Sequence, residues 1–334
     1  MKVIRFSSFK ETEGLFTAAL AGHDVVFTPE PLSLSSAHLA EGAEVISVFV
    51  DCDVSKEVID KLTEVKLIVA ESTGIDHIDA AYAEQRGIRV ASVPGYGVSA
   101  VAEFTFGLML NLSRKISLAS EQVREHGEFN VRAFQGFDLS GKTLGVVGTG
   151  RIGMHVIEIA RGFNMNIVAF DVHPDNARAA ALGFSYVGLL ELAEQADVVT
   201  LHVPYIPETH HLISAGVFAK MKHGAILINT ARGEVVDTIA FIEALKSGKI
   251  AGAGLDVLEG ERELHREGEL IMQIAESHDL RPLIGDHMLM DMPNVIVTPH
   301  IAFHSKEADA DRVSKAVHAI TEYLTIASGG TKPM

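Results

Sequence analysis

The stretch TLGVVGTGRIGMHVIEIARGFNMNIVAFD, residues 143–171, decides the fold and organises the rest of the chain. Its apolar runs at residues 144–147 and 167–170 are typical of two buried strands. Between them, apolar side chains recur at helical spacing from Ile152 to Ala160, and Gly162 can end that helix. The stretch therefore predicts a strand–helix–strand unit.

A glycine pattern stands at the turn from the first strand into the helix. It has the form G-x-G-x-x-G and consists of Gly148, Thr149, Gly150, Arg151, Ile152 and Gly153. In this context the first glycine permits a tight turn, the second lets a pyrophosphate approach the backbone, and the third lets the helix lie close to the sheet. The helix N-terminus adds unpaired N–H groups that attract phosphate. The turn is thus predicted to bind a dinucleotide rather than to be a glycine-rich turn without a ligand.

Asp171 ends the second strand, 18 residues after the last glycine of the pattern (171 − 153). A carboxylate at this position can accept hydrogen bonds from the ribose hydroxyls of the adenosine half and repels a 2′-phosphate. No arginine follows it directly, because residues 172–174 are Val-His-Pro. The predicted cofactor is therefore NAD and not NADP.

Composition narrows the possible functions. The chain has 334 residues and a formal net charge of −16, which disfavours binding to nucleic acid or to an anionic membrane surface. The longest apolar run, residues 104–112, is too short to span a bilayer, and the N-terminus lacks the apolar core of a signal peptide. Cys52 is the only cysteine, so an intramolecular disulfide and a cysteine-rich metal site are excluded. We expect a cytoplasmic protein without a metal site.

Strand and helix patterns alternate along the whole chain, which predicts parallel, doubly wound α/β sheets. Five strands are expected in the first part, at residues 3–6, 24–27, 44–50, 67–70 and 89–92, and six between residues 143 and 298. We expect a Rossmann NAD-binding domain, residues 100–299, inserted into a flavodoxin-like substrate domain of residues 1–99 and 300–334, with the active site in the cleft. Ser99 is expected to cap a long apolar helix to about residue 116, which we expect to be both a buried connector and a subunit interface.

Three ionisable residues follow the carboxyl ends of strands expected in the nucleotide domain: Arg232, Glu261 and His300. An arginine fork matches a substrate carboxylate, and histidine can exchange a proton near neutral pH. A neighbouring carboxylate stabilises the imidazolium form. Each residue alone has an ordinary explanation as a surface charge. Together, beside an NAD motif, they predict the reduction of a keto acid by hydride.

The chain resembles the D-isomer-specific 2-hydroxyacid dehydrogenase family over nearly its whole length. The resemblance is carried by the glycine pattern and by four further stretches: residues 201–204 (LHVP), 229–233 (NTARG), 254–257 (GLDV) and 299–300 (PH). It implies that Arg232 binds the substrate, that His300 is the acid/base, and that Glu261 supports it. Glu261 is preferred to Glu259 because the family glutamate lies five residues after the aspartate, here Asp256 (256 + 5).

The resemblance also implies the binding residues. Beyond the glycine pattern and Asp171, the implied cofactor contacts are His202, Val203, Pro204, Thr209, Thr230, Ala231, Arg232, Asp256 and His300. Asp256 would face the nicotinamide carboxamide, and residues 202–204 would flank the adenine. The implied substrate contacts are Thr73, Gly74, Tyr96, Arg232 and Phe303.

Several features resemble the D-lactate dehydrogenase branch, above all Tyr96 and Phe303 as pocket aromatics and the long charged excursion at residues 259–294. The resemblance implies a homodimer that reduces pyruvate to D-lactate with NADH. Glyoxylate, hydroxypyruvate, 2-ketobutyrate and phenylpyruvate remain alternative substrates. Formate or phosphite oxidation is a third possibility, disfavoured because formate enzymes of this kind carry Gln where Glu261 stands. An NAD-sensing corepressor is the alternative from another class. The physiological direction and the role of residues 259–294 stay open.

Overall fold

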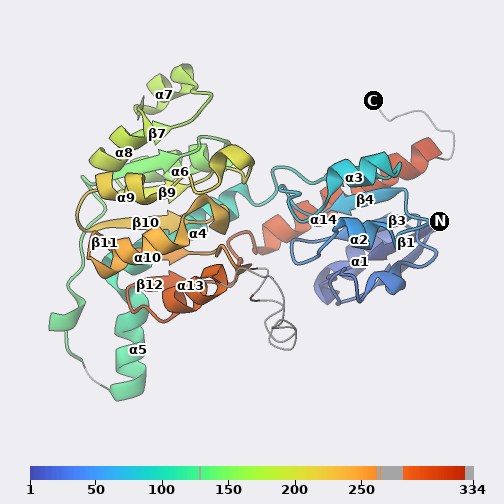
Figure 1. Cartoon of the computed structure of the whole chain (residues 1–334), viewed down its shortest axis with the longest axis horizontal. Coiled ribbons are helices and arrows are strands. Elements are labelled where there is room, and N and C mark those ends of the chain that lie inside the picture. The colour runs from blue at the N-terminus through green and yellow to red at the C-terminus, as the bar shows by residue number, and fades with distance from the viewer. Residues whose placement is uncertain (128, 262–263, 265–280, 328–334) are drawn as a thin grey trace. The chain divides into compact units, whose positions relative to one another are not determined.

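The computed structural model describes residues 1–127, 129–261, 264 and 281–327. The chain divides into two compact units (Figure 1). Unit 1 comprises Met1–Gly97 and Phe303–Met334, and unit 2 comprises Val98–Ala302. The sequence-based boundaries were 99/100 and 299/300. Half of the excursion at residues 259–294 lies outside the described residues.

Unit 1 contains a five-stranded parallel sheet in the order β2-β1-β3-β4-β5. This is the flavodoxin-like order of a doubly wound sheet, so the predicted fold class is confirmed for this unit. The central strands β3 and β4 are buried along their full length, as strands covered by helices on both faces must be. The strands are β1 (Lys2–Arg5), β2 (Asp24–Phe27), β3 (Val45–Val48), β4 (Leu67–Ala70) and β5 (Arg89–Ser92).

The helices of unit 1 come from both ends of the chain. They are α1 (Lys10–Ala19), α2 (Lys56–Ile59), α3 (Ala80–Gln85) and α14 (Lys306–Ala327), with a 3₁₀ turn at Ala37–Ala40. Helix α14 packs against α1 and β4 (Figure 1). The last helix of the chain therefore completes the unit that the first strand begins.

Unit 2 contains a seven-stranded parallel sheet in the order β12-β11-β10-β9-β6-β7-β8, which is the Rossmann order extended by one strand. Six strands were predicted. The strand that was missed, β8, has only two residues, too few for any periodic pattern. The strands are β6 (Thr143–Val147), β7 (Asn166–Phe170), β8 (Ser185–Tyr186), β9 (Val198–Leu201), β10 (Ala225–Asn229), β11 (Ile250–Leu255) and β12 (Val295–Val297).

The described helices of unit 2 are α4 (Val98–Arg114), α5 (Ile116–His126), α6 (Arg151–Gly162), α7 (Asn176–Leu182), α8 (Leu189–Gln195), α9 (Ala215–Lys220), α10 (Thr238–Lys246) and α13 (Arg281–Met290). Short 3₁₀ turns occur at Arg132–Phe134, Pro207–Thr209 and Gly233–Val235. Ser99 was wrongly expected as a cap, because α4 already begins at Val98. The left-handed backbone of Lys115, with φ +53°, separates α4 from α5, a helix that was not predicted.

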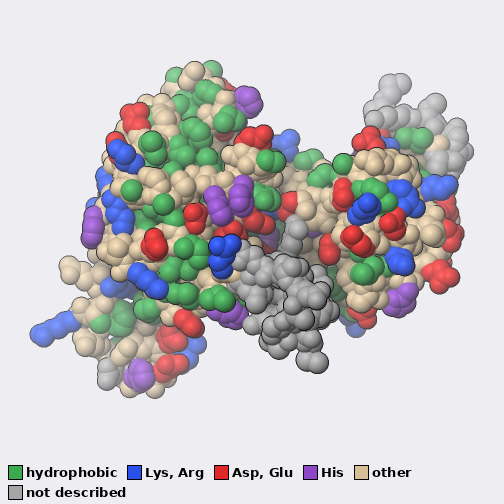
Figure 2. Space-filling model, viewed as in Figure 1, with side chains coloured by type: hydrophobic (Ala, Val, Ile, Leu, Met, Phe, Trp, Pro, Cys, Tyr) green, Lys and Arg blue, Asp and Glu red, His purple; other side chains and the backbone are tan. Residues whose placement is uncertain are grey.

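Cys52 is buried, and burial raises the pKa of its thiol to about 11. Within the described ranges, no helix is both long and apolar enough to cross a membrane. The same residues contain no group of three or more His, Cys, Asp or Glu side chains arranged to hold a metal ion. On the face seen in Figure 2, acidic side chains are spread over both units among fewer basic ones, in keeping with the net charge of −16.

Candidate active site

In the glycine turn, Gly148 and Gly153 are closely packed against backbone atoms, whereas Gly150 faces open space. A Cβ on Gly148, whose φ is +90°, would lie 2.7 Å from the carbonyl oxygen of His202, and one on Gly153 would lie 2.0 Å from that of Gly148. A Cβ on Gly150 would meet no atom within 4 Å. Because α6 begins at Arg151, its free N–H groups face this open space. The turn therefore fits a pyrophosphate.

Asp171 is anchored to the glycine turn at the end of β7. One carboxylate oxygen accepts from the backbone N–H of Thr149 (2.6 Å) and from its hydroxyl (2.9 Å), and the other accepts from the N–H of His173 (2.9 Å). Burial alone would raise the pKa of Asp171, but these hydrogen bonds outweigh it and hold the pKa below its usual value. An ionised carboxylate thus stands where the ribose of NAD is expected.

A second group of predicted cofactor residues lies in the loop after β9, the neighbour of β6 in the sheet. Burial lowers the pKa of His202 to about 3, so its ring is neutral at physiological pH. The hydroxyl of Thr209 donates to the carbonyl of Pro204 (2.7 Å) and accepts from the N–H of Ile206 (2.9 Å), which closes the loop. Val203 lies in the same loop. Contact of these residues with the adenine stays a prediction.

Arg232 lies in the turn that follows β10. Asn229, the last residue of that strand, accepts from the N–H of Ala231 (3.0 Å) and donates to the carbonyl of Arg232 (2.8 Å). The hydroxyl of Thr230 lies 3.1 Å from that of Thr105 on α4. The Asn229 side chain therefore fixes the backbone that carries the half-buried guanidinium.

Gly233 brings this turn against the segment that carries Glu261. A Cβ on Gly233 would lie 2.0 Å from the carbonyl carbon of Leu258, so only glycine permits this approach. The same segment is fixed by the buried Asp286, which accepts from the N–H of Gly260 (2.8 Å). Sequence reasoning found neither contact, although Gly233 stood inside the NTARG stretch.

His300 and Glu261 form a pair. The Nδ1 of His300 lies 2.8 Å from a carboxylate oxygen of Glu261, and the two side chains are 19% and 29% exposed. His300 has a left-handed backbone, with φ +53°, and its N–H donates to the carbonyl of Asp256 (2.9 Å). The predicted neighbours are thus within hydrogen-bond distance and remain accessible to a small molecule.

Asp256 holds the loop that carries His300. Its carboxylate accepts from the Thr298 hydroxyl (2.6 Å) and from the N–H groups of Ile301 (3.0 Å) and Ala302 (2.8 Å). Burial raises the pKa of this carboxyl, although the three hydrogen bonds oppose the shift. A contact of Asp256 with the nicotinamide stays a prediction, whereas its support of the loop is visible.

The predicted substrate residues other than Arg232 belong to unit 1. Thr73 and Gly74 follow β4, and the hydroxyl of Ser72 donates to the carbonyl of Gly74 (2.7 Å). The rings of Tyr96 and Phe303 pack edge to face with centroids 6.2 Å apart. Sequence reasoning missed a further member of this aromatic cluster: Phe49, directly after β3, lies 5.2 Å from Phe303.

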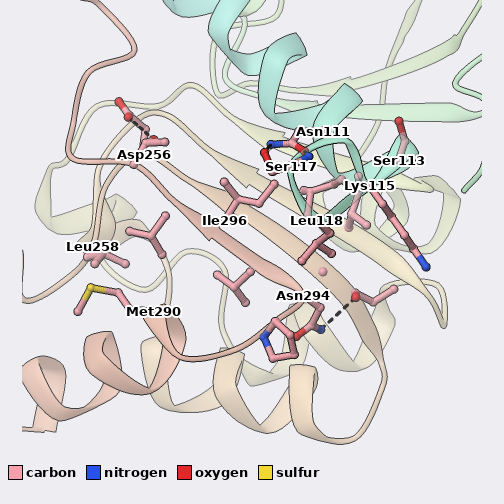
Figure 3. Close-up of a pocket in the computed structure, with 18 of the residues that line it drawn as sticks. Asn111, Ser113, Lys115, Ser117, Leu118, Asp256, Leu258, Met290, Asn294 and Ile296 are labelled. Atoms are coloured by element: carbon pink, nitrogen blue, oxygen red, sulfur yellow. Dashed lines mark hydrogen bonds between the residues drawn. The ribbon is translucent and has the colours of Figure 1, made fainter. Parts of the chain in front are cut away.

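A cavity of about 1250 Å³ opens in unit 2 (Figure 3). Residues of α4 and α5, such as Asn111 and Leu118, form one side, and Ile296 of β12 lies opposite them. Glu261 and His300 also line it. The cavity therefore joins the predicted catalytic pair to the surface around α5.

Comparisons with known proteins give a consistent result. A family model described as "D-isomer specific 2-hydroxyacid dehydrogenase, NAD binding domain" matches residues 106–302. A D-lactate dehydrogenase of Escherichia coli is 38% identical over 289 residues, 86% of this chain and 85% of that protein. An aromatic 2-oxoacid reductase of Clostridium sporogenes is 37% identical over 305 residues, 90% and 89% of the two chains. The structure of Aquifex aeolicus D-lactate dehydrogenase with NAD and lactic acid superposes with a TM-score of 0.85, at 34% identity, over 97% and 95% of the chains.

Proposed function

The chain belongs to the D-isomer-specific 2-hydroxyacid dehydrogenase family of NAD-dependent oxidoreductases, and we propose that it reduces pyruvate to D-lactate with NADH. The observation that carries the proposal is the His300–Glu261 pair, 2.8 Å apart and accessible, in the same unit as the glycine turn. This arrangement supports proton transfer to a carbonyl oxygen, which must accompany the reduction of a keto acid.

Each residue has a defined role in this proposal. Arg232 binds the substrate carboxylate through two parallel N–H groups and orients the carbonyl. Bound NADH supplies the hydride. Because Nδ1 of His300 faces Glu261, Nε2 is the nitrogen that we assign as proton donor to the carbonyl oxygen. Glu261 fixes the orientation of the imidazole through its contact with Nδ1.

In unit 1, the backbone N–H groups of Thr73 and Gly74 bind the substrate carboxylate in this proposal, and Tyr96 and Phe303 receive the substrate side chain. Pyruvate is preferred because relatives include D-lactate dehydrogenases. Glyoxylate, hydroxypyruvate, 2-ketobutyrate and phenylpyruvate remain candidate substrates, and the relative named as an aromatic 2-oxoacid reductase favours testing the last of these.

The proposal includes a homodimer in the cytoplasm. Helix α5 has no buried residue, and its apolar Ile116 and Leu118 are 55% and 43% exposed. Leu118 lines the cavity of Figure 3. A second copy covering this face would remove that apolar area from water. The unpaired Cys52 fits a reducing compartment. Sedimentation equilibrium of the full chain tests the dimer directly.

The test of function is a panel of 2-keto acids, with NADH oxidation followed by absorbance and the product resolved on a chiral column. We expect the highest kcat/KM with pyruvate, and D-lactate as the product. A higher value with another keto acid would retain the mechanism and change the substrate. Binding of NADH without turnover of any keto acid would refute the proposal and favour the NAD-sensing corepressor.

A further inference from the structure

Unit 1 contains a buried charge network at the carboxyl end of its sheet. Glu71, directly after β4, accepts from Nε and Nη2 of Arg5 at 2.6 and 2.8 Å. It also accepts from Nη1 of Arg312 on α14 at 2.6 Å and from the hydroxyl of Ser47 at 2.8 Å. The three charged residues are at most 1% exposed. Two guanidinium groups thus share one carboxylate in the interior.

Asp309 completes the charge balance. One of its oxygens accepts from Nη2 of Arg312 (3.0 Å), and the other lies 2.9 Å from Nδ1 of His304. Arg312 is consequently held at two points, by Glu71 from the sheet and by Asp309 from its own helix. The guanidinium plane has little freedom to rotate.

That plane lies against the aromatic cluster. The Arg312 guanidinium carbon is 4.6 Å from the centroid of the Phe49 ring and 5.6 Å from that of Phe9. The buried Nε–H of Arg312 has no hydrogen-bond acceptor among the described residues. A desolvated guanidinium over a ring face is attracted by the ring quadrupole. Arg312 therefore helps to fix the Phe49 ring.

Phe49 packs against Phe303 and so restricts the position of its ring. Their centroids are 5.2 Å apart with the planes at 71°, which is the favoured edge-to-face contact of two aromatic rings. Phe49 is 5% exposed, whereas Phe303 is half-buried and within reach of a ligand. The order of contacts from the interior outward is Glu71, Arg312, Phe49 and Phe303.

We propose that Arg312 is a positioning residue for substrate selection. Through Phe49 it fixes the Phe303 ring, which forms one side of the substrate pocket, and it thereby limits the size of the keto acid side chain that the pocket accepts. The proposal rests on the function proposed above, because it takes Phe303 as part of the substrate pocket. It assigns to the C-terminal helix a role in specificity without any contact between Arg312 and the substrate.

The test compares Arg312→Met and Arg312→Lys with the wild-type enzyme. Methionine keeps the length but removes the charge, and Arg5 still pairs with Glu71. Lysine keeps the charge but loses the flat face over Phe49, so it retains the ion pair if the methionine variant fails to fold. The matched control is Lys315→Met, which removes a charge from an exposed ion pair with Asp311 on the same helix.

The readout is kcat/KM for glyoxylate, pyruvate and 2-ketoisocaproate, which carry a hydrogen atom, a methyl group and a branched chain on the keto carbon. In both Arg312 variants we expect the ratio of kcat/KM for 2-ketoisocaproate to kcat/KM for pyruvate to rise about threefold to thirtyfold. The reason is that the Phe303 ring, no longer held through Phe49, can move aside for the larger side chain. The kcat/KM for glyoxylate and the KM for NADH should not change. If Arg312 contributed only to stability, its loss would lower kcat/KM for all three substrates by the same factor.

A ratio that stays at the level of Lys315→Met, or falls, would overturn the proposal while wild-type turnover leaves the proposed function standing. If the wild-type enzyme turned over none of the keto acids, the proposed function would fail, and this inference would fail with it.

Discussion

The two sheets use the carboxyl ends of their strands in different ways. In unit 2 these ends present Glu261 and His300, whose side chains are 29% and 19% exposed and face each other across 2.8 Å. In unit 1 the same edge carries Arg5 and Glu71, which are at most 1% exposed and bind each other. Both arrangements pair a carboxylate with a nitrogen-bearing side chain after a parallel strand, yet only the first is open to a ligand.

The difference shows that strand-end position does not by itself identify a site. Glu71 is the first residue after β4 and Arg232 the third after β10, so their positions alone would favour Glu71 at least as much as Arg232. What separates them is whether the charge is satisfied inside the fold. A buried pair must compensate its own desolvation through close partners, which leaves little for a substrate. Exposed polar groups held by the backbone keep their binding capacity.

The largest expected effect is the loss of Arg232. Arg232→Ala should lower kcat/KM for the best keto acid about 100- to 10,000-fold, since two charge-assisted hydrogen bonds to the carboxylate are lost. Unfolding should be little affected. Steady-state kinetics and a thermal melt measure both, with Arg161→Ala on the exposed side of α6 as control. Full activity would remove Arg232 from the site.

Glu71→Gln should show the opposite pattern in unit 1. Two buried guanidinium groups would lose their shared carboxylate, so we expect unfolding to become easier by about 3–5 kcal/mol. Hydrogen exchange of peptides from β3 and β4 reports this unit separately from unit 2. Asp311→Asn, which breaks the exposed pair with Lys315, is the control and should leave exchange unchanged. Unaltered exchange in Glu71→Gln would contradict the claim that the buried charges of unit 1 stabilise its fold.

Asp171→Ala should have the smallest effect. We expect the preference for NADH over NADPH to fall about tenfold, because a charge-assisted acceptor for the ribose and the repulsion of a 2′-phosphate are both lost. The ratio of kcat/KM for the two cofactors measures it. The control is Asp175→Ala, four residues on, where the carboxylate caps α7. The same ratio in wild type and Asp171→Ala would exclude a ribose contact.

Much of unit 2 could be predicted because its constraints are local. The spacing of Gly148, Gly150 and Gly153 follows from one tight turn, and the bounds of β6 and α6 follow from apolar periodicity within it. The pairing of His300 with Glu261 was predicted from the resemblance and is within hydrogen-bond distance in the structure. The catalytic roles of the pair stay predictions.

Features that depend on distant or very short segments could not be predicted. Arg312 and Glu71 are 241 residues apart, and no periodicity relates them. Asp286 fixes the Glu261 segment from a helix 26 residues further on. Strand β8 has two residues, so only its pairing with β7 defines it. Phe49 lies inside the strand predicted at residues 44–50 and directly after the observed β3, but an apolar residue there gives no chemical signal.

The most direct test of the account is a single-turnover measurement with pyruvate and saturating NADH in wild type and His300→Asn. We expect the rate of NADH oxidation to fall about 100- to 10,000-fold in the variant, while the Kd for NADH, measured by its fluorescence, stays the same. That result would place proton transfer at the His300–Glu261 pair. An unchanged rate would contradict the proposed mechanism and return the pair to a structural role.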